Sequence, residues 1–446
     1  MKYDVIIIGA GPAGYVAAVR AGQIGLKTLV VDKKYIGGMC LNWGCIPTKA
    51  ILESAKWFRR LTEAADFGID GIDHTKLSFN WSKAVKHAFG VVARMSHDIE
   101  LLWKKHGVEF LKGEATVISN HEVEVNNRVL DADHIILATG SRPAPILNFP
   151  ANKVLELELL YLQTELPERP VIYGQGATVA ELAQFFAMIG KRATVVATDR
   201  PILPGFDVYL NLYLLKKLEK LQVPVHFAEN ISLVADNKIK AGEAVIEFDR
   251  VINCSWRQAV LPTMNIALDL EDGYLKVNHL MQTSVPIIYA TGDINGKSYL
   301  AHAASAQAMS AINHIKGIVQ PVNFKHLPLN VYTEPEIAQV GLTEEEIRSR
   351  EIPYKVSELP LSSNGKALLE GMTEGVVRIL HEIKYGEVLG VQIIAPNATD
   401  MISEAAVLMQ MEGTVFDLAK TVHAHPTMSE VFMEAGIAGS NATELW

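Results

Sequence analysis

The chain has 446 residues, of which 49% are hydrophobic, and its 41 basic and 50 acidic side chains give a formal net charge of −9. A chain of this length is expected to fold into about two to four domains, and its acidic excess disfavours nucleic acids and anionic membranes as partners, because neither attracts a negatively charged protein. No apolar run approaches the ~18 residues that cross a bilayer, and the N-terminal segment lacks the unbroken apolar core of a signal peptide, so we expect a cytoplasmic protein.

Residues 3–33 contain, in order, an apolar strand, a glycine turn, a helix and a second strand, which together form a βαβ unit. The glycines fit the spacing GxGxxG and an acid ends the second strand, at Gly9, Gly11, Gly14 and Asp32. This combination indicates a dinucleotide site, although a buried βαβ unit without a ligand is the alternative. In such sites the glycines allow a tight turn, close approach of the backbone to a pyrophosphate and close helix packing, and the acid accepts from a ribose hydroxyl.

Two of the three cysteines, Cys40 and Cys45, follow this unit closely, and the third, Cys254, stands alone. In a reducing compartment a close pair is more often catalytic or metal-binding than structural. A zinc site would need further soft ligands, and the sequence has no second cysteine pair. We therefore expect no metal site.

The βαβ pattern returns over residues 169–199, with Gly174 and Gly176 in the first two glycine positions. Val179 takes the third position, and Ala197 stands where the first unit has its terminal acid. The second unit therefore keeps the turn but lacks both the helix-packing glycine and the ribose-binding carboxylate.

The remaining segments complete two nucleotide-binding sheets and a third domain. Strands that run into Ala-Thr-Gly occur in residues 134–143 and 287–308. Residues 107–130 and 222–250 alternate short apolar segments with turn residues, which is typical of antiparallel meanders. From residue 326 the pattern of strands and one amphipathic helix predicts an α+β domain.

In this order, the motifs resemble the class I FAD-dependent pyridine nucleotide-disulfide oxidoreductases, and most of all their dihydrolipoamide dehydrogenase branch. The resemblance covers nearly the whole chain and rests on CLNWGCIPTK, YATGDI, LAHAA, VYTEPEIAQVGLTEEE and HAHPTMSE. It implies an α/β fold with two Rossmann-like domains, of FAD and NAD type, and a C-terminal α+β dimerisation domain. The expected boundaries are 1–142 and 259–325 for the FAD-binding domain, 143–258 for the NAD-binding-like domain and 326–446 for the dimerisation domain.

The resemblance also implies that Cys40 and Cys45 form a redox disulfide, in which Cys40 exchanges with a substrate dithiol and Cys45 contacts the flavin. On an ideal helix, Cα atoms five residues apart are separated by roughly 8–9 Å, whereas a disulfide tolerates little beyond ~7 Å. We therefore expect a distorted segment, which Gly44 and Pro47 make easier. The alternative is a pair of buried thiols without a bridge.

Two further pairs carry roles in the family. Lys49 is expected near the flavin, paired with Glu181 in the helix of the second unit; the alternative is that both are solvated helix charges. His425 is expected to take a proton from the dithiol, and Glu430 to orient its imidazole, in the active site of the other subunit of a homodimer. The alternative role of Glu430 is a capping box with Thr427.

The resemblance assigns the cofactor positions as follows. Those expected to bind FAD are Gly9, Gly11, Gly14, Asp32, Lys49, Gly113, Thr139, Gly140, Asp293 and Ala303. Those expected to bind NAD are Gly174, Gly176, Ala197 and Arg257. Members that use NAD carry an acid at the position of Ala197. The family normally has a Gly-Arg-Arg-Pro run where this chain has Trp256 and Arg257 followed by Gln-Ala. NAD is thus the acceptor that the family implies, but these departures predict weak or absent NAD binding.

The sequence therefore predicts an enzyme that oxidises a protein-bound dihydrolipoyl group, or a small dithiol, through the Cys40–Cys45 pair and FAD. One alternative is the same dithiol chemistry with a non-nicotinamide electron partner. Another is a non-catalytic flavoprotein subunit of a lipoyl-bearing complex, against which the complete set of cysteines, His425 and Glu430 argues. Glutathione reduction is a further alternative, although the arginines of NADP-using members are missing.

Overall fold

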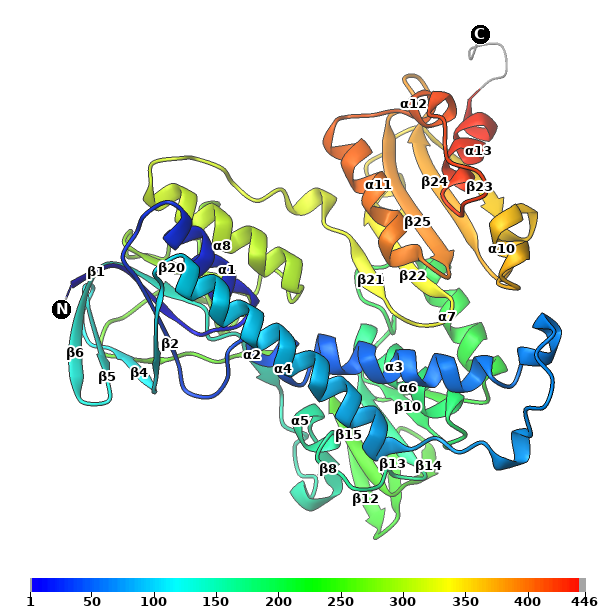
Figure 1. Cartoon of the computed structure of the whole chain (residues 1–446), viewed down its shortest axis with the longest axis horizontal. Coiled ribbons are helices and arrows are strands. Elements are labelled where there is room, and N and C mark those ends of the chain that lie inside the picture. The colour runs from blue at the N-terminus through cyan, green and yellow to red at the C-terminus, as the bar shows by residue number, and fades with distance from the viewer. Residues whose placement is uncertain (1, 441–446) are drawn as a thin grey trace.

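The computed structural model of the chain describes residues 2–440, and its first sheet contains the first βαβ unit (Figure 1). The strand order is β17-β4-β5-β6-β1-β2-β3, with β20 also paired to β6. The strands are β1 Lys2–Ile8, β2 Thr28–Asp32, β3 Glu109–Lys112, β4 Ala115–Val117, β5 Glu122–Val125, β6 Arg128–Leu137, β17 Thr263–Met264 and β20 Ile288–Ala290. β1 lies parallel to β2 and β6 and is almost wholly buried, as expected for a central strand.

Helices α1 (Pro12–Gln23) and α8 (Ala301–Ile315) pack on each other beside this sheet (Figure 1). The buried face of α1 is made of alanine and glycine, so the helix approaches the sheet closely. A Cβ added at Gly14 would overlap the carbonyl oxygen of Gly9. The helix-packing role that the sequence predicts for Gly14 is confirmed by this contact.

The second unit forms a parallel sheet of order β11-β10-β9-β15-β8 with an antiparallel meander, β12 to β14, beside it. The strands are β8 Val154–Leu155, β9 Pro170–Gly174, β10 Thr194–Ala197, β11 Val225–Phe227, β12 Ile231–Ala235, β13 Lys238–Ala241, β14 Ala244–Glu247 and β15 Arg250–Cys254. The helices are α5 Leu157–Leu160, α6 Ala177–Met188 and α7 Val208–Lys220. α6 is buried over nearly its whole length because it lies between this sheet and a helix of the first unit.

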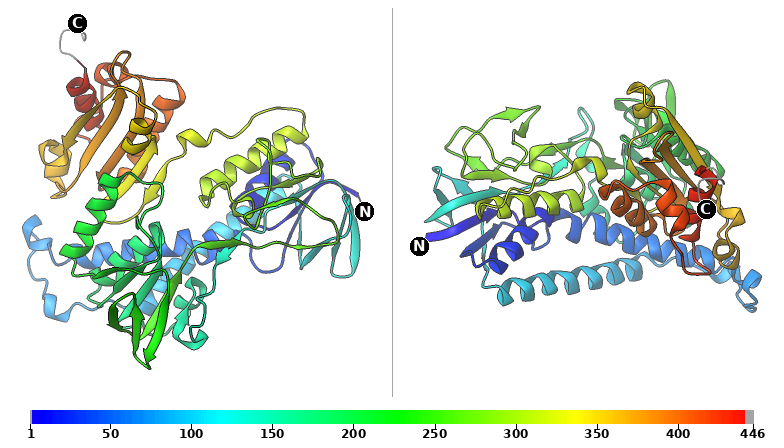
Figure 2. Two further views of the ribbon diagram at one scale, coloured as in Figure 1. Left: turned by 180° about the vertical axis from the view of Figure 1, so that it is seen from behind. Right: turned by 90° about the horizontal axis from the view of Figure 1, so that it is seen from above.

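That helix is α3 (Cys45–Arg60), which follows the short α2 (Gly38–Asn42) and packs on the long α4 (Trp81–Lys105). Seen from above, α3 and α4 run side by side along the molecule (Figure 2). α3 therefore carries residues of the first unit onto α6 of the second.

Short antiparallel pairs complete the passage between the two units. β7 (Ser141–Pro143) pairs with β16 (Arg257–Ala259), so the chain leaves the first unit and returns to it through one two-stranded ribbon. β18 (Leu270–Glu271) pairs with β19 (Tyr274–Leu275) on the return segment.

The last domain is an antiparallel sheet of order β21-β22-β25-β24-β23 with helices packed against it (Figure 1). The strands are β21 Leu329–Val331, β22 Glu336–Gly341, β23 Tyr354–Pro360, β24 Val376–Glu382 and β25 Val388–Ala395. The helices are α9 Glu344–Ser349, α10 Gly365–Leu369, α11 Ala398–Gln410, α12 Val415–Lys420 and α13 Glu430–Gly439. The predicted fold class is confirmed. The exact domain boundaries stay predictions, and residues 441–446 of the last one lie outside the described part.

Within residues 2–440, none of the helices combines the length and the apolar character needed to span a membrane.

We predict that Gly14→Ala destabilises the protein by about 1–3 kcal/mol, because the overlap with the Gly9 carbonyl outweighs the gain of about 0.5–1 kcal/mol that alanine brings to a helix interior. Urea unfolding measures the change. Gly11→Ala is the matched control, since a Cβ there meets nothing closer than 3.9 Å. Equal stabilities for the two variants would contradict the packing argument.

Candidate active site

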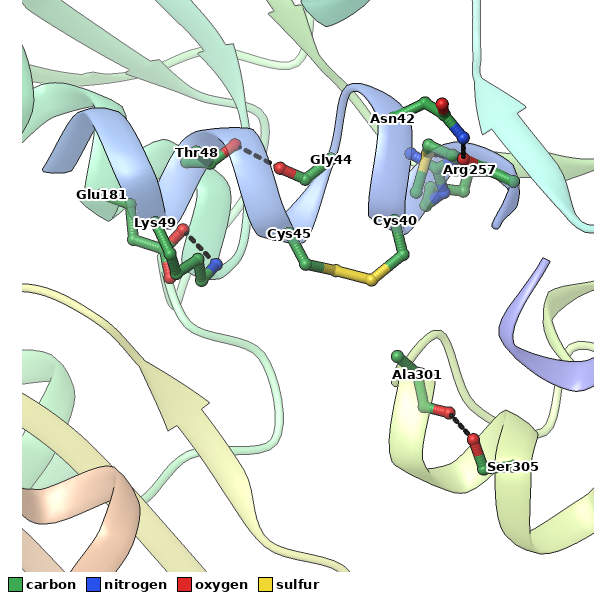
Figure 3. Close-up of a disulfide and its surroundings, with 12 residues drawn as sticks. Cys40, Asn42, Gly44, Cys45, Thr48, Lys49, Glu181, Arg257, Ala301 and Ser305 are labelled. Carbon is green, nitrogen blue, oxygen red and sulfur yellow. Dashed lines mark hydrogen bonds and ion pairs between the residues drawn. A yellow bond between two sulfur atoms is a disulfide. The ribbon is translucent and has the colours of Figure 1, made fainter. Parts of the chain in front are cut away.

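The two close cysteines lie at the junction of two helices (Figure 3). Cys40 is in α2, Cys45 begins α3, and the interruption at Trp43 and Gly44 brings their Cα atoms to 4.7 Å with the sulfurs bridged. A Cβ at Gly44 would stand only 3.1 Å from the Cα of Cys40, which favours glycine here. The predicted distortion is confirmed, and the alternative of two unbridged thiols is wrong.

Hydrogen bonds support the interruption from both sides. The Thr48 hydroxyl donates to the carbonyl of Gly44 at 2.6 Å and lies 2.8 Å from the hydroxyl of Tyr161. The amide of Asn42 donates to the Gly38 carbonyl at 2.8 Å. Sequence reasoning missed Thr48 and Tyr161 as a pair, because 113 residues separate them and only their chemistry could have suggested a contact.

Lys49 and Glu181 form the expected ion pair, with Nζ 2.8 Å from Oε2 (Figure 3). The Glu181 side chain is 1% exposed, and its other oxygen accepts from the backbone N–H of Tyr332 at 3.1 Å. The Lys49 ammonium also lies 4.7 Å from the centre of the Tyr332 ring, a cation–π distance. A buried carboxylate with one ion pair and one backbone hydrogen bond is not a solvated helix charge, so that alternative is wrong for Glu181.

The first glycine turn has the features of a pyrophosphate cradle. Gly9 has φ +111°, and α1 begins without a side-chain cap, which leaves N–H groups at the helix N-terminus for an anion. Asp32 accepts from the N–H of Ala10 at 2.8 Å, which holds its carboxylate beside the turn. Gly113 lies next to it, donating its N–H to the Asp32 carbonyl at 3.0 Å.

Asp293 lies at the other end of this site with little exposure. Its Oδ2 accepts from the hydroxyl of Ser141 and stands 3.6 Å from Nε of Arg257. Burial raises the pKa of Asp293, and the Ser141 hydrogen bond and the Arg257 charge oppose that rise. Burial likewise lowers the pKa of Arg257, which Asp293 opposes. The two groups therefore stabilise each other's charged forms in a desolvated place.

The other positions predicted to bind FAD lie around Asp293 or close by in sequence. Thr139 donates to the Val260 carbonyl, and Gly140 has φ +73°, at the point where β6 leads into β7. Ala303 is buried in the first turn of α8. The hydroxyl of Thr291, two residues before Asp293, is buried without a protein partner. Three groups fit a dinucleotide cofactor such as FAD. The uncapped N-terminus of α1 suits a pyrophosphate, the Asp32 carboxylate suits a ribose hydroxyl, and the Thr291 hydroxyl has no partner in the protein.

The second glycine turn keeps its shape and lacks its carboxylate. Gly174 has φ +138° and contacts the Cys254 carbonyl so closely that a Cβ would overlap it, and Gly176 has φ +90° with open space beside it. Ala197 ends β10 fully buried, with no acid in its place. Trp256, just beyond β15, is 58% exposed and contacts the ring of Tyr299 edge-on.

On the last domain, His425 lies in the loop before α13, and Glu430 is the first residue of that helix. Nδ1 of His425 is 2.8 Å from Oε1 of Glu430, and Oε2 accepts from the N–H of Thr427 at 2.8 Å. The N–H of Thr427, and then His425, lower the pKa of Glu430. One oxygen of Glu430 thus orients the imidazole and the other binds the loop backbone. The full capping box with Thr427 does not form, because α13 begins after Ser429 without a side-chain cap and the Thr427 hydroxyl donates to the Ala424 carbonyl. The His425 side chain is 79% exposed.

Two models of one protein family match most of the chain. Residues 3–308 match the family model of the pyridine nucleotide-disulphide oxidoreductases, and residues 327–436 match their dimerisation domain. The chain belongs to this family. As a pyridine nucleotide-disulphide oxidoreductase it is a flavoprotein that uses FAD, and its dimerisation domain implies a homodimer.

Relatives cover almost the whole oxidoreductase. It is 36% identical to dihydrolipoyl dehydrogenase of Bacillus subtilis, over 96% of this chain and 97% of the relative. It is 35% identical to that of Mycoplasma genitalium, over 97% of each chain. The crystal structure of LpdA from Mycobacterium tuberculosis matches with a TM-score of 0.88 at 26% identity, over 98% of this chain and 99% of that one. The oxidoreductase is therefore dihydrolipoyl dehydrogenase-like.

The arrangement can carry out thiol–disulfide exchange. Reduction of the Cys40–Cys45 bridge yields two thiols, and FAD, when bound, would supply the acceptor for their electron pair. Gly9, Asp32 and Asp293 would hold that cofactor. Within the described part of the chain, no cluster of three or more histidine, cysteine or acidic side chains could hold a metal ion. The third cysteine, Cys254, is free and buried, and burial raises the pKa of its thiol to about 12.

We predict that the oxidised protein shows no reactive thiol while folded, one thiol per chain when unfolded, and three when unfolded after reduction, because only Cys254 lies outside the bridge. Its thiol stays protonated, and thus unreactive, at any pH well below 12. Titration with a chromogenic disulfide reagent measures each count. Three thiols in the unfolded, unreduced protein would contradict the bridge.

Proposed function

We propose that this oxidoreductase oxidises a protein-bound dihydrolipoyl group, or a small dithiol, at the Cys40–Cys45 bridge and delivers the electrons to FAD. The observation that carries the proposal is the His425–Glu430 pair, an imidazole that is oriented by a carboxylate and yet exposed. A structural histidine is usually buried against its partners, whereas a proton acceptor for an incoming substrate must be reachable.

The substrate dithiol reduces the Cys40–Cys45 bridge in two exchange steps. His425 takes the proton of one substrate thiol, and the thiolate attacks Sγ of Cys40, which breaks the Cys40–Cys45 bond and releases the Cys45 thiolate. The second substrate thiol then displaces Cys40 from the mixed disulfide. The substrate leaves as a disulfide, both cysteines are reduced, and Glu430 keeps the imidazole oriented throughout.

His425 belongs to the dimerisation domain and the cysteines to the first unit. Among residues 2–440, no hydrogen bond or ion pair joins the His425 loop to the segment of Cys40 and Cys45. We therefore propose that each active site combines the cysteines of one subunit with His425 of the other.

His425→Gln is expected to slow anaerobic bleaching of the flavin by dihydrolipoamide roughly 10²–10⁴-fold, because the exchange loses its general base. Stopped-flow absorbance measures the rate. His423→Gln is the matched control, since His423 is bound to Glu404 at 2.7 Å and serves the loop. A wild-type rate in the His425 variant would refute its assigned role.

For the last electron transfer we propose that NAD is a poor acceptor. Support comes from Ala197 at the end of β10, where no carboxylate can bind a ribose diol, and from the indole of Trp256 beside the turn after β15. Losing hydrogen bonds to a carboxylate costs about 1.5–3 kcal/mol. The same two features favour the second candidate, a dithiol oxidoreductase whose electron partner is not a nicotinamide.

We expect micromolar NADH to reduce the flavin slowly or not at all, and Ala197→Glu to tighten NADH binding roughly 10- to 150-fold, the equivalent of the lost hydrogen bonds. Anaerobic titration, followed at the flavin absorbance, gives both values. Thr198→Glu, with the same charge one residue along, controls for net charge. Prompt reduction of the unaltered protein by micromolar NADH would contradict the proposal.

A further inference from the structure

The side chain of Arg257 points into the first unit, although its sequence position follows the last strand of the second. Its Nε donates to the hydroxyl of Ser141 at 2.6 Å, and Nη2 donates to the Ser141 carbonyl at 2.8 Å. Nη2 also contacts Sδ of Met39, the residue before Cys40. Its expected role in NAD binding stays a prediction, since none of these contacts is to the second glycine turn.

The Ser141 hydroxyl links Arg257 to Asp293 by accepting a hydrogen bond from the first and donating one to the second. A hydroxyl has a single proton, and that of Ser141 is donated to Asp293, so its oxygen is free to accept from Arg257. The order guanidinium, hydroxyl, carboxylate is therefore fixed by donor and acceptor chemistry. The β7–β16 ribbon holds the first two groups in register, because Ser141 lies opposite Ala259, two residues beyond Arg257.

The two charges are nearly buried, with Arg257 19% and Asp293 17% exposed. Removing one partner of such a pair leaves the other charge desolvated and uncompensated. Asp293 without Arg257 would keep only the Ser141 hydrogen bond and one from its own backbone N–H to oppose the effect of burial. It would then be a weaker and less oriented acceptor for a ligand hydroxyl.

We propose that Arg257 is a positioning residue of the flavin site, which keeps the Asp293 carboxylate ionised and aimed at the cofactor and fixes the segment that carries Cys40. The inference rests on FAD binding by the first unit, and it requires neither a lipoyl substrate nor NAD. Arg257 would also raise the flavin potential, because a buried cation near the cofactor favours the more negative, reduced form of the flavin.

Holoenzyme carrying Arg257→Gln is expected to bind FAD roughly 10- to 150-fold more weakly, as expected for lost hydrogen bonds to a charged group. Its two-electron flavin potential should become more negative by ~30 mV, which corresponds to a tenfold change in the equilibrium constant for flavin reduction. Arg257→Lys should recover most of the potential, because it keeps the charge, and less of the affinity, because it lacks the planar fork. Fluorescence of released FAD and equilibration with a redox dye measure the two quantities.

Arg142→Gln is the matched control, because Arg142 is the neighbour of Ser141 on β7, is exposed, and has the same charge. An equal shift in that variant, or an unchanged affinity and potential in Arg257→Gln, would overturn the proposal. If Arg257→Gln does not fold, Ser141→Ala keeps both charges and removes the relay, and an unchanged FAD affinity there overturns it equally. If the unaltered protein does not oxidise dihydrolipoamide while Arg257→Gln still weakens FAD binding and lowers the flavin potential, the result counts against the proposed function alone.

Discussion

The helix interruption at Trp43 and Gly44 is the constraint on which the site depends. It brings two Cα atoms to 4.7 Å that an unbroken helix would hold roughly 8–9 Å apart. The short helix before it is pressed onto the nucleotide turn: a Cβ at Gly38 would collide with Gly11, and the N–H of Gly37 donates to the Ala10 carbonyl at 2.8 Å. The same segment therefore sets both the bridge and its distance from the cofactor cradle.

Buried ion pairs then fix the domains around this segment. Glu181, in the second unit, binds Lys49 of the first unit with one oxygen and the N–H of Tyr332 in the last domain with the other. A single carboxylate thus joins three parts of the chain. Losing one partner of a buried pair costs about 3–5 kcal/mol, whereas exchanging the whole pair for apolar groups is often neutral, so these pairs specify an arrangement more than they add stability.

Much of this arrangement was predictable from local sequence. Glycine spacing fixed the two turns, and the five-residue interval between cysteines required a break. What sequence could not supply was the direction of side chains over long separations. Arg257 is in a three-residue strand, too short for a pattern of alternation to indicate which face it uses. Its partner Ser141 is 116 residues away, and Asp293 is 152 residues from Ser141.

His425 lies on a different domain from the Cys40–Cys45 bridge. A base for thiol exchange must reach the bridge, yet this imidazole is exposed on a different domain and held by Glu430 in a loop of its own. An orientation established before any substrate arrives is useful only if another surface completes the site. A two-fold homodimer meets that need twice, because its self-complementary interface places each loop in the same relation to the other subunit. Under the proposed mechanism, catalysis would then depend on assembly, while the cofactor cradle and the bridge are built within a single chain.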